Sequence, residues 1–168
     1  TRCADVTGVQ TCALPIWLLE RVKAELRPGT RIIGIASGGV WLAERMASDL
    51  SLTDPVGVIS STMHRDDFAR RGMTSAAPTR IPFDVEGADI LLLDDVLYTG
   101  RTIRAVMNEL FDFGRPTRVR LAVLVDRDGR ELPVQADICM ARISLPTTQS
   151  LSLDREPSGR FTFNVKEI

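Results

Sequence analysis

Two adjacent carboxylates stand between a short apolar run and a turn of small and hydroxyl residues. Residues 90–93 are four apolar residues, Asp94 and Asp95 follow, and residues 99–102 form the turn. A central strand delivers its last residues to the carboxyl edge of a parallel sheet, where open α/β proteins bind ligands. Burying a carboxylate without a partner is costly. The pair is therefore expected to accept hydrogen bonds from ligand hydroxyls or to bind a metal.

The turn after the acidic pair is suited to binding a phosphate. Thr99 and Thr102 carry hydroxyls, and Gly100 permits the close turn between them. Consecutive backbone N–H groups at the beginning of a helix, together with the helix dipole, attract an anion. Carboxylates beside such a turn predict a sugar-phosphate site. The alternative, an acidic helix cap followed by an ordinary turn, leaves the ordering of acids, glycine and hydroxyls unexplained.

The elements that must position these residues alternate between two kinds. Short apolar runs typical of buried strands occupy residues 31–36, 56–60, 88–93 and 119–125. Apolar residues recur at helical spacing in residues 17–26, 41–50 and 102–113. Strands alternating with helices predict an α/β fold with a doubly wound central parallel sheet. The residues from 136 onward hold short strand-like runs and are expected to form an antiparallel edge or a small hood.

Composition limits the remaining classes. The 168 residues include 44% hydrophobic residues, enough for one substantial core, and the net charge of -1 gives no overall basic field. One histidine and three cysteines without paired metal-ligand spacing argue against structural zinc and against a Ser-His-Asp hydrolase. No apolar run is long enough to span a bilayer, so we expect a cytoplasmic protein without membrane contact. Residues 17–168 are predicted to be one domain, and residues 1–16 a non-native or disordered leader.

The motif at residues 94–102, Asp-Asp-Val-Leu-Tyr-Thr-Gly-Arg-Thr, resembles the ribose-phosphate signature of type I phosphoribosyltransferases. With Phe-Gly-Arg-Pro at 113–116, Leu-Ala-Val-Leu-Val-Asp-Arg at 121–127 and Arg-Glu-Leu-Pro at 130–133, the chain resembles the bifunctional pyrimidine-operon regulator and uracil phosphoribosyltransferase family. The resemblance implies a type I phosphoribosyltransferase fold. It also implies conversion of uracil and 5-phosphoribosyl diphosphate (PRPP), with Mg²⁺, to UMP and diphosphate.

The resemblance assigns roles to particular residues. Asp94 and Asp95 are the candidate catalytic residues, binding the ribose hydroxyls and contacting the metal indirectly. The residues that would surround the 5-phosphate are Val96, Leu97, Tyr98, Thr99, Gly100, Arg101 and Thr102. Arg127 and Ile138 are assigned to the base pocket, with Cys139 beside Ile138. Cys139 is not expected to be a nucleophile, because nothing near it in sequence would lower its pKa.

Two loops complete the predicted site. Ser37, Gly38 and Gly39 align with the diphosphate loop of the family, where the more familiar sequence is Thr-Arg-Gly. Gly38 therefore replaces an arginine, and weaker donor binding is expected. Arg65 and Asp66 resemble the opening of the flexible loop of the family, which would close over the reaction and exclude water. The polar segment 62–79 is predicted to be a long mobile loop.

RNA binding is where the residues and the resemblance disagree. Regulators of this family bind a pyrimidine leader RNA through basic residues, yet residues 133–141 lack the arginine and lysine commonly found there. Regulation of pyrimidine-operon transcription through RNA is kept as a second function, for which the residues give weaker support than for the enzyme activity. We also expect a homodimer or larger homo-oligomer. Two alternatives stay open at this point. One is a non-catalytic regulator that senses nucleotides and binds RNA, and the other is a purine phosphoribosyltransferase.

Overall fold

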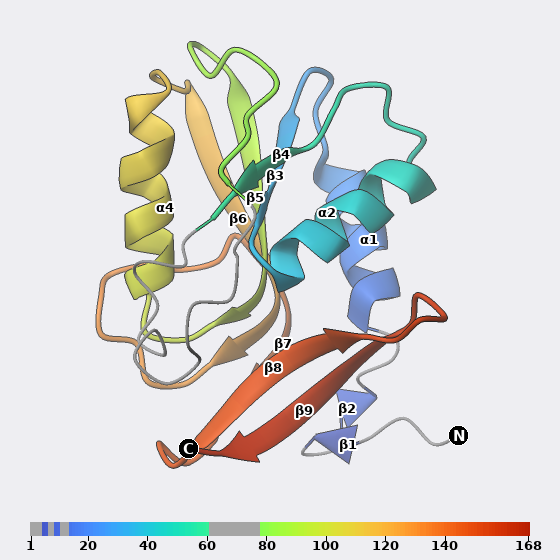
Figure 1. Cartoon of the computed structure of the whole chain (residues 1–168), viewed down its shortest axis with the longest axis vertical. Coiled ribbons are helices and arrows are strands. Elements are labelled where there is room, and N and C mark those ends of the chain that lie inside the picture. Colours follow the sequence, from blue (N-terminus) through green and yellow to red (C-terminus); the bar gives the residue numbers. More distant parts are fainter. Residues whose placement is uncertain (1–4, 7–8, 11–13, 61–77) are drawn as a thin grey trace.

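The computed structural model describes residues 5–6, 9–10, 14–60 and 78–168. Within these residues a parallel sheet lies between helices, and a two-stranded hairpin lies beyond one end of the sheet (Figure 1). The helices are α1 (Leu14–Glu25), α2 (Gly38–Asp49) and α4 (Arg101–Asp112). The strands are β1 (Asp5–Val6), β2 (Val9–Gln10), β3 (Arg31–Ile35), β4 (Gly57–Ile59), β5 (Asp89–Leu97), β6 (Arg118–Arg127), β7 (Ile138–Ile143), β8 (Gln149–Arg155) and β9 (Phe161–Glu167).

The main sheet has the strand order β4-β3-β5-β6-β7, and every neighbouring pair is parallel. Its central strand, β5, pairs with β3 on one side and with β6 on the other. Parallel neighbours require crossover connections, and α2 and α4 lie within two of them. The predicted doubly wound α/β fold is confirmed.

Alternation along β5 explains how one strand serves two cores. Leu91 and Leu93 belong to the cluster that contains Leu18 of α1 and Leu42 of α2. Ile90 and Leu92 belong to the opposite cluster, which includes three apolar residues of α4, namely Ile103, Val106 and Leu110. Successive side chains of a strand point to opposite faces, so a continuous apolar run is what a strand covered on both faces requires.

The prediction of an antiparallel edge or hood from residue 136 onward is wrong for β7, which is a parallel edge strand of the main sheet beside β6. The hood is the hairpin of β8 and β9, which pair antiparallel. It lies beyond the end of the sheet where the parallel strands finish (Figure 1). Leu153, Phe161 and Phe163 attach it by packing into the cluster that α1 and α2 share. Arg155 of β8 adds an ion pair with Glu44 of α2, at 3.1 Å. The hood is thus joined to the same layer that holds the glycine turn at residues 37–39.

Several boundaries differ from the sequence prediction. Helix α1 begins at Leu14, three residues before the expected beginning, and β5 continues through the acidic pair to Leu97 instead of ending at residue 93. The strands β1 and β2 pair with each other in the segment predicted to be a non-native or disordered leader. That this segment is non-native stays a prediction. The predicted mobile loop lies almost entirely at residues 61–77, outside the described residues. None of the described helices is both long and apolar enough to cross a bilayer.

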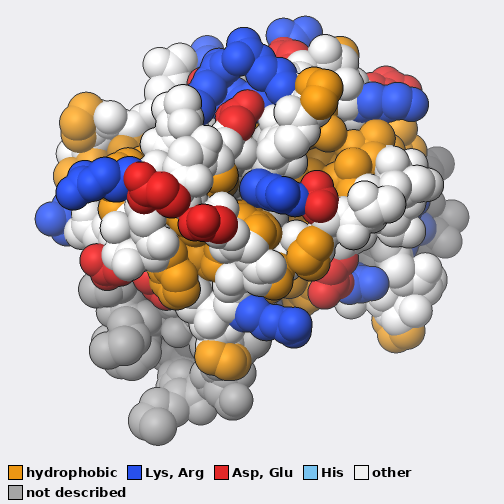
Figure 2. Space-filling view, turned by 90° about the horizontal axis from the view of Figure 1, so that it is seen from above, with side chains coloured by type: hydrophobic (Ala, Val, Ile, Leu, Met, Phe, Trp, Pro, Cys, Tyr) orange, Lys and Arg blue, Asp and Glu red, His pale blue; other side chains and the backbone are white. Residues whose placement is uncertain are grey.

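Charges at the amino edge of the sheet are mixed. Figure 2 shows this end of the molecule, at the top of Figure 1, with Lys and Arg side chains interspersed with Asp and Glu and with apolar side chains between them. Arg31 of β3 pairs with Asp54 at 2.5 Å, one example of this mixing. Alternation along residues 118–120 predicts two outward arginines around a buried Val119, but Arg118 is exposed, Val119 is half-buried and Arg120 is only 5% exposed.

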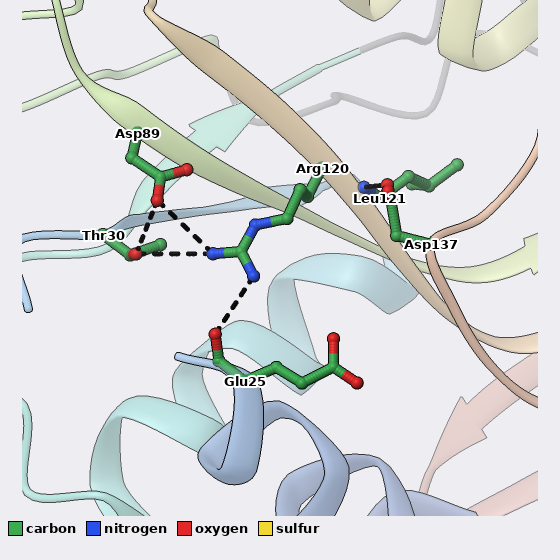
Figure 3. A network of polar contacts seen from close by, with 6 residues as sticks. All are labelled: Glu25, Thr30, Asp89, Arg120, Leu121 and Asp137. Atoms are coloured by element: carbon green, nitrogen blue, oxygen red, sulfur yellow. Dashed lines mark hydrogen bonds and ion pairs between the residues drawn. The ribbon is translucent and has the colours of Figure 1, made fainter. Parts of the chain in front are cut away.

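Arg120 is buried, and three groups from separate segments of the chain converge on it (Figure 3). Its Nη1 donates to the Glu25 carbonyl at the end of α1, at 3.2 Å. Its Nη2 donates to Thr30 Oγ1 at 3.4 Å and lies 3.5 Å from Asp89 Oδ2. Thr30 Oγ1 in turn donates to the same carboxylate oxygen at 3.2 Å. This cluster, Glu25–Thr30–Asp89–Arg120, ties α1, β5 and β6 together beneath the core.

Candidate active site

A cleft of about 410 Å³ opens at the carboxyl edge of the sheet, between β5, the beginning of α4 and the hood. It brings together most of the residues assigned to the site from sequence, which come from segments far apart in the chain. Its lining includes Ser37, Asp94, Asp95, Val96, Leu97, Tyr98, Thr99, Gly100, Thr102 and Arg127. The size suits a ligand of nucleotide dimensions, and the position is where open α/β sheets bind ligands.

The acidic pair lies within β5 rather than after it. Asp94 is register partner to Val123 of β6 and is only 3% exposed, while Asp95 is half-buried. Asp94 Oδ1 accepts a hydrogen bond from the Asp95 backbone N–H at 3.0 Å. Asp95 Oδ2 accepts one from the Leu153 N–H of the hood at 3.4 Å. Both carboxylates therefore meet backbone donors while they line the cleft.

The phosphate turn, residues 98–102, leads from β5 into α4. Gly100 has a φ of 92°, a left-handed conformation that glycine adopts without strain, and α4 begins at the next residue. Thr99 Oγ1 accepts the Arg101 N–H at 3.3 Å. Helix α4 therefore begins at the cleft, which Thr102 and Ile103 line, and its dipole favours an anion there. The Arg101 guanidinium is directed elsewhere, to Glu131 at 2.6 Å.

The glycine turn of residues 37–39 lies against the acidic pair. The Ala36–Ser37 peptide bond is cis, and Ser37 is exposed and lines the cleft. Gly38 is buried, and a Cβ atom there would lie 2.5 Å from Asp95 Cγ and 2.6 Å from its Oδ2. The absence of a side chain at position 38 is thus what allows Asp95 its present position. An arginine there, as in the more familiar loop, would require Asp95 to move.

The two residues assigned to the base pocket occupy different places. Arg127 lines the cleft but is only 3% exposed, with its guanidinium carbon 3.9 Å from the centroid of the Tyr98 ring. Its Nη2 donates to the Pro146 carbonyl at 2.9 Å. Ile138 is buried in the core beside β6 and lines a separate groove with Arg21 of α1. The base-pocket role of Ile138 therefore stays a prediction.

Cys139 lies in that same separate groove and does not line the cleft of the acidic pair. Its Sγ donates to the Ala141 carbonyl at 3.1 Å. Burial raises the pKa of the Cys139 thiol above its ordinary value, with smaller opposing contributions from hydrogen bonds. A raised pKa keeps the thiol protonated at neutral pH, which is the opposite of what a nucleophilic cysteine requires.

The hood contributes residues to the cleft that the sequence analysis does not name. They are Ser150, Leu151, Ser152, Leu153 and Asp154 of β8, with Lys166 and Ile168 at the end of the chain. The signal was present in the sequence, because Ser150, Ser152 and Asp154 alternate with two leucines in the pattern of a strand with one polar face. Arg65 and Asp66, the residues assigned to the flexible loop, lie outside the described residues.

Comparison with known proteins identifies the family. The phosphoribosyl transferase domain matches residues 28–148, which is more than half of the chain. This chain is a member of the phosphoribosyltransferase family. The match begins just before β3 and ends at the beginning of the hood, so it contains the acidic pair, the phosphate turn and the glycine turn. An enzyme that transfers a phosphoribosyl group, a glycosyltransferase, is therefore the established class.

Curated relatives and solved structures agree on this family. A protein of Ralstonia nicotianae named "Bifunctional protein PyrR" is 53% identical over 136 residues, covering 79% of this chain and 78% of the relative. A protein of Nitrosococcus oceani with the same name is 47% identical over 139 residues, covering 81% and 78%. The chain thus belongs with the PyrR proteins. The resemblance found in the sequence is confirmed.

The fold itself resembles purine phosphoribosyltransferases of known structure. One from Pyrococcus horikoshii is 25% identical, with a TM-score of 0.59, covering 85% of this chain and 89% of that one. A hypoxanthine phosphoribosyltransferase from Staphylococcus aureus is 16% identical, with a TM-score of 0.61, covering 80% and 73%. At such identity the second likeness shows the fold and not the substrate. The predicted type I phosphoribosyltransferase fold is confirmed.

Proposed function

We propose that this chain transfers the phosphoribosyl group of PRPP to uracil, giving UMP and diphosphate. The observation that supports this most is the meeting of Asp94, Asp95 and the phosphate turn along one cleft at the carboxyl edge of the sheet. Carboxylates suit the ribose hydroxyls and the turn suits the 5-phosphate. Relatives of this chain at 53% and 47% identity are PyrR proteins, whereas the purine enzymes resemble it at 25% identity or less. Uracil is therefore favoured over a purine base.

The proposed reaction exchanges one bond at the anomeric carbon of the ribose for another. A bond forms between a uracil nitrogen and that carbon, the bond from the carbon to diphosphate breaks with its electron pair leaving on the diphosphate oxygen, and the proton of the uracil nitrogen passes to the released diphosphate. Asp94 and Asp95 would hold the ribose hydroxyls while positive charge develops on the sugar, and their negative charge would stabilise it. The N–H groups of the phosphate turn would hold the 5-phosphate, and those of the glycine turn would hold the diphosphate.

The donor set fits Mg²⁺ when the substrate supplies most of the ligands. The described residues contain no group of three side chains able to hold a metal ion. Mg²⁺ commonly keeps several waters and binds through one or two carboxylates and substrate phosphates, which matches two cleft carboxylates and a diphosphate ligand. We therefore propose an indirect role for Asp94 and Asp95, through the ribose hydroxyls or water. When bound, the ion would neutralise charge on the departing diphosphate.

An assay of UMP formation tests the proposed function. Purified protein would be incubated with PRPP and Mg²⁺ together with uracil, hypoxanthine, guanine or adenine in parallel, and the nucleotides would be separated by chromatography. We expect UMP and no purine nucleotide. A purine product instead of UMP would favour the alternative enzyme, and no product from any base would favour a non-catalytic nucleotide sensor.

RNA binding is a second candidate function, and the name "Bifunctional" carried by the relatives favours it. The charges of the described residues argue against it. Three arginines, Arg115, Arg118 and Arg120, lie close together in the sequence, and Arg120 is buried beside Asp89. Basic and acidic side chains are also interspersed on the face seen in Figure 2. Tight RNA binding requires several phosphate contacts on one basic surface.

We therefore propose that the enzyme activity is retained and that leader-specific RNA binding is absent. A filter-binding titration at physiological salt, with and without UMP, would compare a pyrimidine-leader RNA with an unrelated RNA of equal length. Equal, weak binding is expected. Tight, UMP-enhanced binding of the leader alone would show that assembly creates a basic surface. We also propose a cytoplasmic homodimer or larger homo-oligomer, which light scattering can measure.

A further inference from the structure

The β6–β7 connection, residues 128–137, lies directly against the phosphate turn. Thr99 O accepts two hydrogen bonds from it, from the N–H groups of Glu131 at 3.0 Å and Leu132 at 3.1 Å. Gly100 faces it as well, because a Cβ atom there would lie 3.3 Å from Val134 Cβ. The connection thus fixes the backbone of the turn through residues that do not line the cleft.

Arg130 of this connection joins the turn to the end of β6. Its Nη1 donates to the Tyr98 carbonyl and its Nη2 to Asp126 Oδ1. Its side chain is 25% exposed, so the guanidinium is largely enclosed by these acceptors. The ion pair with Asp126 balances the arginine charge locally. Arg130 therefore contributes to the turn by fixing the position of the Tyr98 carbonyl. A planar guanidinium can satisfy two acceptors in fixed directions, whereas an ammonium group cannot.

The Tyr98 ring is enclosed by the same segment. Arg127 lies over its face at 3.9 Å, a cation–π arrangement. Gly129 lies against its edge, since a Cβ atom at position 129 would be 2.5 Å from Tyr98 Cε2. Gly129 also has a φ of 110°, where a side chain is strained. Ring and carbonyl of Tyr98 are therefore both held before any ligand binds.

We propose that Arg130 is a positioning residue for the 5-phosphate, acting through the Tyr98 carbonyl, and that Gly129 and Arg127 hold the Tyr98 ring for the same purpose. The proposal rests on the proposed function, because it assumes that the phosphate turn binds the 5-phosphate. A turn that is already shaped loses less conformational entropy when its ligand binds. Removing Arg130 should therefore weaken the contribution of the phosphate while leaving contacts to the base and ribose unchanged.

Comparing UMP with uridine isolates that contribution, because uridine lacks the phosphate. Titration calorimetry would give the ratio of the two dissociation constants for the wild type, Arg130→Ala, Arg130→Lys and the control Arg118→Ala. Arg118 is an exposed arginine at the other end of β6. We expect Arg130→Ala to lower the UMP preference about tenfold, the factor that corresponds to one charge-assisted hydrogen bond. Arg130→Lys should lower it about threefold, on the same grounds. The control should keep it.

A second measurement uses the fact that Tyr98 is the only tyrosine of the chain. Protein labelled with 3-fluorotyrosine should give one ¹⁹F resonance from the folded state. We expect Arg130→Ala to shift or broaden this resonance without ligand, while Arg118→Ala leaves it unchanged. Gly129→Ala, which pushes directly on the ring, should shift it further. This readout reports the turn whether or not the variant turns over substrate, and a thermal melt identifies any variant that is unfolded.

The outcomes distinguish a failure of the phosphate-turn assignment from a failure of the positioning role of Arg130. If the wild type binds UMP no better than uridine, the phosphate-turn assignment itself is wrong. If the wild type prefers UMP and folded Arg130→Ala and Arg130→Lys keep that preference, the positioning role is wrong while the proposed function stands. If Arg130→Ala does not fold, Arg130→Lys, which keeps the charge and the aliphatic stem, decides the question.

Discussion

The two edges of the parallel sheet treat buried charge in opposite ways. At the amino edge, Asp89 Oδ2 meets Arg120 and Thr30, so the partners of this carboxylate oxygen are side chains of the protein itself. At the carboxyl edge, Asp94 and Asp95 accept hydrogen bonds from backbone N–H groups and line an open cleft. Both edges use aspartates of the same strand, β5. The ion pair of Asp89 and Arg120 holds elements of the fold together, whereas Asp94 and Asp95, which face a cleft, can act on a ligand.

The largest effect is expected at the amino edge, on stability. Arg120→Ala would leave the half-buried Asp89 carboxylate without its arginine and would release the Glu25 carbonyl at the end of α1. Breaking a buried ion pair by removing one partner costs about 3 kcal/mol of unfolding free energy. Urea denaturation followed by circular dichroism would measure this. The rate of UMP formation by the folded variant should stay within about twofold of wild type, since the cluster lies at the other edge of the sheet.

A paired control sharpens this prediction. Replacing both charges, with Arg120→Met and Asp89→Leu together, removes the ion pair without leaving a lone charge and should recover most of the lost stability. A loss below about 1 kcal/mol for Arg120→Ala alone would place the cluster among ordinary surface ion pairs. The contrast between the two edges would then be wrong.

Substitution of the acidic pair should have the opposite effect to Arg120→Ala: turnover should fall while stability changes little. Asp94→Asn and Asp95→Asn are each expected to lower turnover at least about tenfold, because a neutral amide cannot stabilise charge developing on the ribose. The melting temperature should change little, since the amide oxygen can still accept the backbone N–H. UMP formation and thermal unfolding would be measured on the same preparations. Wild-type kinetics in both variants would remove the ribose-site assignment.

The glycine turn allows a smaller test of the same edge. Gly38→Ala places a Cβ atom 2.5 Å from Asp95 Cγ, so either the carboxylate or the turn must shift. Overpacking of this kind costs about 1–3 kcal/mol of unfolding free energy. Because the shift displaces a carboxylate of the proposed ribose site, we also expect turnover to fall about fivefold. Gly38→Arg should not act as a gain of a diphosphate ligand and should be at least as impaired. Ser48→Ala, at an exposed position of α2, is the matched control. Improved PRPP binding by Gly38→Arg would contradict this account.

The smallest effect is expected at Cys139, which lines neither the cleft nor the cluster around Arg120. Because burial raises its pKa, the thiolate fraction at neutral pH is below that of an exposed cysteine. Iodoacetamide should therefore label Cys139 slowly at pH 7 and faster as the pH rises, as peptide mass spectrometry can measure. The raised pKa favours the folded state at low pH, and this contribution is lost as the pH rises through the folded-state pKa. Cys139→Ser should leave turnover unchanged.

Sequence alone predicted the parts of the molecule that depend on local pattern. Periodicity located the strands β3, β4, β5 and β6 and the described helices α1, α2 and α4, because an element covered by a core repeats its apolar residues at a fixed spacing. The ordering of residues 94–102 placed the acids and the phosphate turn together, since a strand followed by a helix leaves few other arrangements. Asp94, Thr99 and Gly100 line the cleft as that ordering predicts.

What sequence could not predict depends on contacts between distant segments. Burial of Arg120 requires Glu25, Thr30 and Asp89 to converge, and no local pattern encodes that meeting. The match between Gly38 and Asp95 is of the same kind: the glycine suggested a lost ligand, while the structure shows space taken by a carboxylate 57 positions later in the chain. Pairing across the fold decides both cases.

The position of β5 at the centre of the sheet also has a consequence for synthesis on the ribosome. Arg31 of β3 pairs with Ile90, and Ile90 pairs in turn with Val119 of β6. When β3 emerges, only one of its two sheet neighbours, the short strand β4, follows it closely in the sequence. The apolar residues Ile32 and Ile33 then lack the pairing with β5 on the other side of β3. Until β5 is made, these apolar residues stay exposed to association with other chains. Slow translation between residues 60 and 90 would prolong that interval, and chaperone contact is expected to concentrate there.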